Sequence, residues 1–117
     1  MKKIEATKIG SNKKMNFVIV EDKGLALSEE GIFYNIITDL EEKTEECYYT
    51  EDNVFFNYEE TLPSEVISIN EDLVSKVSTS ELNEMLIATL SVCFENSKED
   101  AIIEDCIFIV EDALKNL

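Results

Sequence analysis

Residues 80–117 have the sequence SELNEMLIATLSVCFENSKEDAIIEDCIFIVEDALKNL and contain two helical patterns. In the first pattern, apolar side chains recur at helical spacing after Ser80, the expected N-cap: Leu82, Met85, Leu86, Leu90 and Cys93. A polar link at residues 96–98 leads to the second pattern, which extends from Ile102 to Leu117, with Glu99 and Asp100 in its expected first turn. We therefore expect a C-terminal helical hairpin.

The N-terminal half has strand patterns instead. Residues 3–9 and 15–20 flank a Gly10-Ser11-Asn12 turn, and residues 25–27 follow a second turn signal at Asp22-Lys23-Gly24. Residues 47–49 and 54–58 flank a loop at residues 51–53, which predicts another hairpin. Because neither helix can bury its apolar stripe alone, the sequence predicts an α+β fold, an N-terminal antiparallel sheet of hairpins packed against the C-terminal helical hairpin. We expect one domain over residues 1–117.

Two segments are ambiguous. Residues 29–42 fit one helical face with Ser28 as N-cap, although Gly31 followed by Ile32-Phe33-Tyr34 could equally open a strand; we favour the helix. After Pro63, residues 66–69 are expected to form a last strand. Asn70 is expected to cap a short helix that extends through Val77.

The composition excludes several function classes. The 117 residues include 26 acids and ten lysines but no His, Arg or Trp, and the formal net charge is −16. Without His the chain lacks the commonest general base and metal ligand. Without Arg, and with this charge, it is poorly suited to bind nucleic acid or an anionic membrane. We expect no enzyme activity and no cofactor.

Metal and redox chemistry are not indicated either. The ligand spacing and glycine of an EF-hand loop are missing, and Cys47, Cys93 and Cys106 have no CxxC spacing. Each cysteine has apolar neighbours, so we expect three reduced core residues and no metal site. No apolar run is long enough to cross a bilayer and no signal-peptide pattern follows Met1, so a cytoplasmic protein is expected.

The negative charge is unevenly distributed. Residues 1–20 contain five lysines and one acid, so the excess of acids lies in residues 21–117, where many acids occur as doublets. Such a surface can serve solubility alone. A domain of this length is about 35 Å across, a length of duplex DNA that carries roughly 20 phosphate charges. A net charge of −16 is therefore of the order that a DNA mimic needs.

Phe108 departs from the amphipathic pattern of the last helix. On a helical wheel counted from Ile102 it lies at about 240°, whereas the apolar stripe is centred near 60°. Its neighbours at i−4, i−3, i+3 and i+4 are all acids: Glu104, Asp105, Glu111 and Asp112. An aromatic side chain surrounded by charge is typical of a protein-binding hot spot, while packing on a sheet or a second subunit would bury the same ring.

These features favour a small inhibitor or immunity-type protein that occupies a basic surface of a target protein, for example one that binds nucleic acid. The residues expected to make this contact are Glu104, Asp105, Phe108, Glu111 and Asp112. Phage-encoded antagonists of host defence fit the same description. The alternative is a structural or assembly subunit that oligomerises through its C-terminal helices. Both a monomer and an oligomer are compatible with the sequence.

Overall fold

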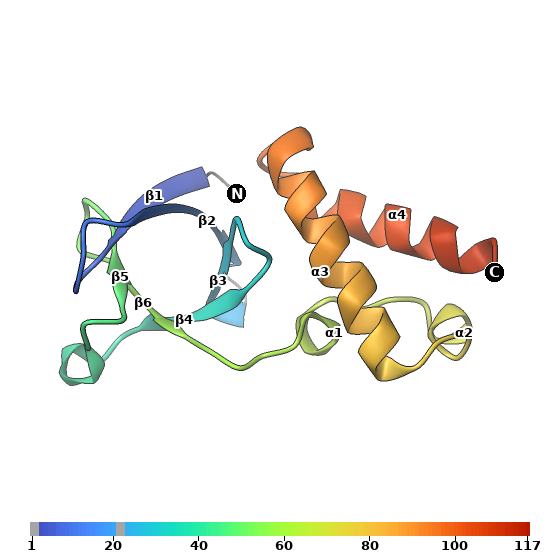
Figure 1. Cartoon of the computed structure of the whole chain (residues 1–117), viewed down its shortest axis with the longest axis horizontal. Coiled ribbons are helices and arrows are strands. Elements are labelled where there is room, and N and C mark those ends of the chain that lie inside the picture. Colours follow the sequence, from blue (N-terminus) through green and yellow to red (C-terminus); the bar gives the residue numbers. More distant parts are fainter. Residues whose placement is uncertain (1–2, 21–22) are drawn as a thin grey trace. The chain divides into compact units, whose positions relative to one another are not determined.

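A computed structural model describes residues 3–20 and 23–117 of the chain. The chain divides into two compact units, Met1–Glu60 and Thr61–Leu117. Strands build the first unit and helices build the second (Figure 1), which confirms the α+β class. That residues 1–117 form one domain stays a prediction.

The first unit is a small closed barrel of antiparallel strands. Its strands are β1 (Lys3–Lys8), β2 (Lys14–Val20), β3 (Leu25–Ser28), β4 (Phe33–Ile37), β5 (Tyr48–Tyr49) and β6 (Phe55–Tyr58). They follow each other around the barrel in the order β1-β2-β3-β4-β6-β5 (Figure 1). Both predicted hairpins are confirmed, as is the extension of the sheet by β3. The turn expected before β3 begins at Asp22, which lies outside the described residues.

Aromatic rings fill the barrel. Phe17 is fully buried, and its ring centroid lies 5.2 Å from that of Tyr34, 5.3 Å from that of Tyr48 and 5.0 Å from that of Phe56. Because a charged phenolate would be desolvated there, burial raises the pKa of Tyr34 to about 12. The aromatic side chains that indicate strands in the sequence therefore also form the core of the barrel.

The helix favoured for residues 29–42 is wrong. Ser28 ends β3, and its hydroxyl accepts from the N–H groups of Glu30 and Ile32, so it caps a turn rather than a helix. Gly31 has a φ of 80°, which a right-handed helix does not allow. Residues 33–37 then pair with β3 on one side and β6 on the other. Pairing on both sides overrides the helical spacing, and only Leu40–Glu42 forms a short 3-10 helix, η2.

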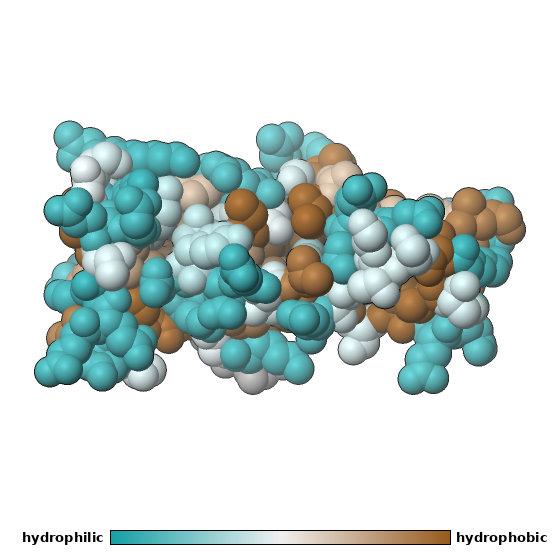
Figure 2. Space-filling model, turned by 60° about the horizontal axis from the view of Figure 1, so that its bottom comes forward, coloured by the Kyte–Doolittle hydropathy of each residue, from teal (hydrophilic) through white to brown (hydrophobic). Residues whose placement is uncertain are grey.

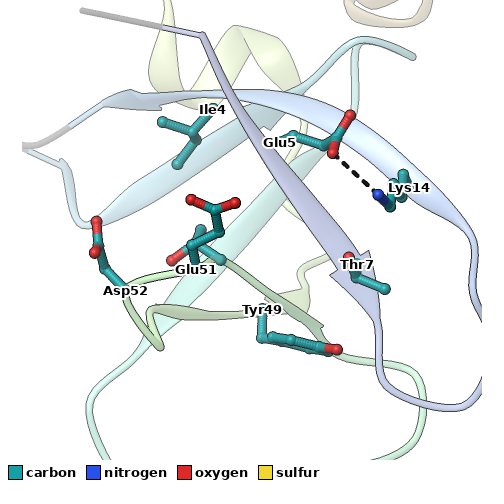
Figure 3. A pocket seen from close by; sticks show the side chains of 8 residues that line it. Ile4, Glu5, Thr7, Lys14, Tyr49, Glu51 and Asp52 are labelled. Atoms are coloured by element: carbon teal, nitrogen blue, oxygen red, sulfur yellow. Dashed lines mark ion pairs between the residues drawn. The ribbon is translucent and has the colours of Figure 1, made fainter.

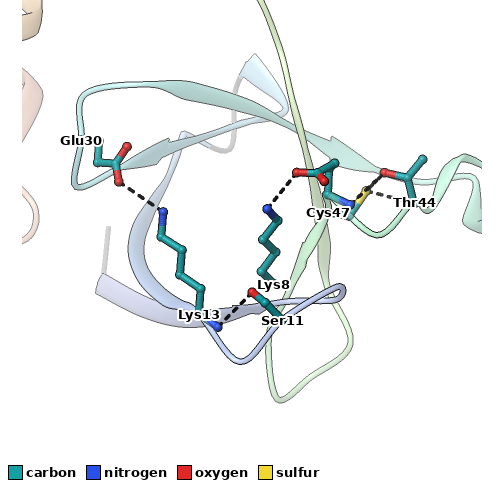
Figure 4. Close-up of polar contacts among 7 residues, drawn as sticks. Lys8, Ser11, Lys13, Glu30, Thr44 and Cys47 are labelled. Atoms are coloured by element: carbon teal, nitrogen blue, oxygen red, sulfur yellow. Dashed lines mark hydrogen bonds and ion pairs between the residues drawn. The ribbon is translucent and has the colours of Figure 1, made fainter.

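Lysines on the barrel surface pair with nearby acids (Figure 4). Lys8 Nζ lies 2.8 Å from Glu46 Oε2, and this hydrogen bond raises the pKa of Lys8. Lys13 Nζ lies 3.6 Å from Glu30 Oε1. Exposed ion pairs of this kind contribute little to stability, but in each one the lysine neutralises the negative charge of a carboxylate.

The second unit contains α1 (Pro63–Val66), α2 (Glu71–Val74), α3 (Thr79–Asn96) and α4 (Ile102–Lys115). The two long helices pack side by side (Figure 1), as the sequence predicts. Their fully buried side chains include Leu86 and Leu90 of α3 and Ile102 and Leu114 of α4. All three cysteines are free and buried, which confirms that they are core residues.

Several helix boundaries differ from those predicted. Ser78, not Ser80, is the N-cap of α3, because its hydroxyl accepts from Glu81 N while Glu81 accepts from Ser78 N. Asn70 caps α2 as expected, but α2 ends at Val74. Glu99 and Asp100 precede α4 instead of forming its first turn.

The strand predicted at residues 66–69 is wrong. Pro63 is instead the first residue of α1, a position that suits its fixed φ. The Glu65 carboxylate accepts from Leu62 N–H at 3.1 Å and so holds this single turn of helix. Residues 67–69 that follow are irregular.

Candidate protein-binding surface

The outer face of α4 contains the five residues that the sequence singles out. We call Glu104, Asp105, Phe108, Glu111 and Asp112 the acidic face of α4. Helical geometry places them together because they are three or four residues apart, opposite the buried positions Ile102, Cys106, Val110 and Leu114. The structure thus brings all five side chains onto one side of a single helix.

Phe108 is exposed. Its relative accessibility is 73%, the highest of the large apolar side chains in the part of the chain that the structure describes. Glu104, Asp105 and Asp112 are exposed as well. Within the single chain, the ring is exposed among the carboxylates.

Glu111 differs from the other three acids because it also has a structural contact. Its Oε2 accepts a hydrogen bond from the backbone N–H of Asn70, the N-cap of α2, at 3.0 Å. The carboxylate therefore fastens the start of α2 to α4 and is only partly exposed. No sequence pattern indicates this contact, because the two residues are 41 positions apart.

Ile109 extends the apolar part of this surface. It follows Phe108 in the sequence, and 45% of it is exposed. On the helical wheel Asp105 and Asp112 lie between Phe108 and Ile109, at about 280–300°. Apolar and acidic side chains thus alternate across the helix.

In the described part of the chain, the lysines of the second unit form no ion pair with these acids. Within residues 61–117, all of which the structure describes, no ion pair joins two side chains, whereas Lys8, Lys13 and Lys14 of the barrel each pair with an acid. Lys76 Nζ donates to the backbone oxygen of Leu114 at 3.1 Å, at the C-terminal end of α4. Residues 61–117 contain twelve acids and three lysines, so this unit has a net charge of −9.

Hydrophilic side chains predominate on one face of the molecule. On the face shown in Figure 2, teal side chains predominate and brown apolar ones lie between them. Among residues 3–20 and 23–117, no group of three or more Cys, Asp or Glu side chains is arranged to hold a metal ion. No helix within the same residues is long and apolar enough to cross a membrane.

Comparisons with protein-family models, with curated proteins and with solved structures gave no match to this chain.

Proposed function

We propose that this protein binds a basic protein through the acidic face of α4 and so covers a basic surface of that target, as an inhibitor or immunity-type protein does. A surface that otherwise binds nucleic acid is the kind of target that best matches the charge. The exposure of Phe108 within four carboxylates carries the proposal.

The ring supplies short-range affinity. An exposed phenyl group gains on the order of 2 kcal/mol when a partner covers it, provided that the partner offers an apolar socket. Phe108 lies on α4, and fully buried side chains on the opposite side of this helix pack it against the rest of its unit. Because the backbone is already ordered, binding costs little conformational entropy.

The surrounding acids determine the chemistry of the partner. Carboxylates that lose water in an interface must meet cations or hydrogen-bond donors, since a buried unpaired charge is strongly unfavourable. Lysine and arginine side chains around the socket meet this requirement. The net charge of −9 on residues 61–117 also speeds encounter with a cationic partner, in a manner that salt weakens.

Self-association through this face is disfavoured by the same charges. A symmetric dimer would place the four carboxylates of one copy against those of the other, with Lys115, at about 220° on the same helical wheel, as the one cation on this side of α4. The proposal is therefore binding to a different, basic protein.

Capture from a lysate of the source cells tests the proposal. The tagged protein is loaded at about 50 mM salt and eluted in steps to about 500 mM, a range over which the Debye length falls from about 14 to about 4 Å. Phe108→Ala serves as the test variant and Val92→Ala as its control, because Val92 is an exposed apolar residue (55%) on the other long helix. Only Glu95 among its i±3 and i±4 neighbours is acidic.

We expect one basic protein to elute at intermediate salt, to be retained by Val92→Ala and to be lost with Phe108→Ala. Equal recovery of many basic proteins by all three versions would contradict the proposal, because the charge would then serve solubility only. Recovery of nothing but the protein itself would instead support an assembly subunit.

A further inference from the structure

On the side away from β2, strand β1 pairs with a neighbouring strand along only part of its length. It pairs with β2 from Lys3 to Thr7, but β5 pairs only with Thr7 and Lys8. Within the described residues, no strand pairs with residues 4–6 of β1 on the side away from β2. The barrel therefore has a seam where β5 ends.

The hydrogen bonds next to this seam show which backbone groups face it. Lys8 N donates to Lys13 O of the β1–β2 turn, and Ile9 N donates to Cys47 O just before β5, each at 2.8 Å. In an antiparallel ladder, successive residues bond to opposite sides. Even-numbered residues of β1 thus bond toward β2, and odd-numbered ones toward β5. Glu5 accordingly directs its N–H and C=O into the seam.

The residues that follow β5 do not continue its pairing with β1, so within the described residues they leave the backbone of Glu5 unpaired on this side. Continuing the β1–β5 register would place Glu51 opposite Glu5, but Glu51 lies in the turn between β5 and β6. Asn53 has a φ of 60° in this turn, and Thr50 accepts from the N–H groups of Asn53 and Val54. These bonds close the turn and end β5 after two residues.

A cavity of about 330 Å³ lies between β1 and this turn (Figure 3). Ile4, Glu5 and Thr7 line it from β1, and residues 49–52 line it from the β5–β6 hairpin. Glu51 and Asp52 contribute carboxylates, while Lys14 Nζ is already paired with Glu5 Oε1 at 3.5 Å. The lining therefore has a net negative charge. The carboxylates of Glu51 and Asp52 in the turn are the ones that remain for a ligand to pair with.

We infer that this seam binds an extended, lysine- or arginine-containing peptide segment, which adds as a short strand beside β1. Its backbone pairs with the N–H and C=O of Glu5, as in other strand additions. Its cationic side chains contact Glu51 and Asp52. Three residues of such a strand span about 10 Å, which matches the uncovered length of β1. The site is separate from the acidic face of α4.

Amide hydrogen exchange, measured by NMR, tests this directly. The probe is a hexapeptide of alternating lysine and valine, and its control is the same peptide with alternate backbone nitrogens methylated, so that charge is kept and strand pairing is lost. We expect saturating probe to slow exchange of the Glu5 N–H about tenfold or more, as a new backbone hydrogen bond should. The Ala6 N–H, which bonds toward β2, serves as internal reference and should not change.

Three variants complete the test. Glu51→Gln combined with Asp52→Asn should weaken peptide binding about fivefold or more, because the turn loses both charges. Phe108→Ala should bind the peptide as the parent protein does, so failure of this site and failure of the α4 surface are distinguishable. Glu41→Gln combined with Glu42→Gln, which removes two exposed carboxylates outside the cavity lining, controls for the loss of negative charge.

Equal protection by the methylated peptide would overturn the inference, since attraction between charges alone would explain it. An unchanged Glu5 exchange rate would overturn it too. Protection of Glu5 that grows with protein concentration in the absence of peptide would assign the seam to a second copy of the chain instead.

Discussion

Phe108→Ala and Leu114→Ala on the same helix should have very different effects on stability. Phe108 is 73% exposed, so only about a quarter of its roughly 200 Å² is covered, which corresponds to about 1 kcal/mol. Alanine has a higher helix propensity than phenylalanine, which offsets about 0.5 kcal/mol of this loss. The net loss for Phe108→Ala should therefore stay below about 1 kcal/mol. Leu114 is fully buried, and its truncation should lower the free energy of unfolding by about 3 kcal/mol.

Urea denaturation followed by circular dichroism measures both changes, with equal m-values as the condition for comparing midpoints. A loss of 2 kcal/mol or more in Phe108→Ala would refute the reasoning, because only a packed side chain has such an effect. The ring would then belong to the core, and the acidic face of α4 would have no exposed aromatic residue to offer a partner.

Three further predictions concern the second unit. Ser78→Ala should lose about 1 kcal/mol of stability because α3 loses its cap, whereas Ser80→Ala should lose little; equal losses in urea melts would contradict the observed cap. Glu111→Ala should destabilise by about 1 kcal/mol through the lost bond to Asn70 N–H and Asp112→Ala by less than half of that, and the reverse order would contradict the contact between α2 and α4. Burial, reinforced by Cys93, raises the pKa of Cys106 from 9.0 to about 12, so above pH 9 the unfolded chain releases its thiol proton first. The unfolding free energy should thus fall between pH 9 and 12, less steeply in Cys106→Ala; identical slopes would argue against a buried thiol.

The elements predicted most accurately were those whose signal is local and periodic. The stripe Leu82, Leu86, Leu90 and Cys93 indicates α3 without any knowledge of its neighbours, and the turn at residues 10–12 fixes the β1–β2 hairpin. The position of Phe108 followed from the same helical geometry, although its exposure did not, because periodicity does not tell what covers a helix from outside.

The errors in the barrel arose where distant contacts outweigh a local pattern. Residues 33–37 have helical spacing, but Gly31 at positive φ and pairing with both β3 and β6 make them a strand. Closure of the barrel likewise depends on the pairing of Thr7 with Tyr49, 42 residues apart, which no local pattern encodes. For the same reason the seam at Glu5 could not be anticipated.

The dissociation constant of the captured target is the most direct measure of the proposed function. It should be determined by titration calorimetry at about 50 and 500 mM salt, for the parent protein and for Phe108→Ala. The account predicts that Phe108→Ala weakens binding about tenfold or more and that high salt weakens it further in both versions. Affinity that is indifferent to both the ring and the salt would contradict binding through the acidic face of α4.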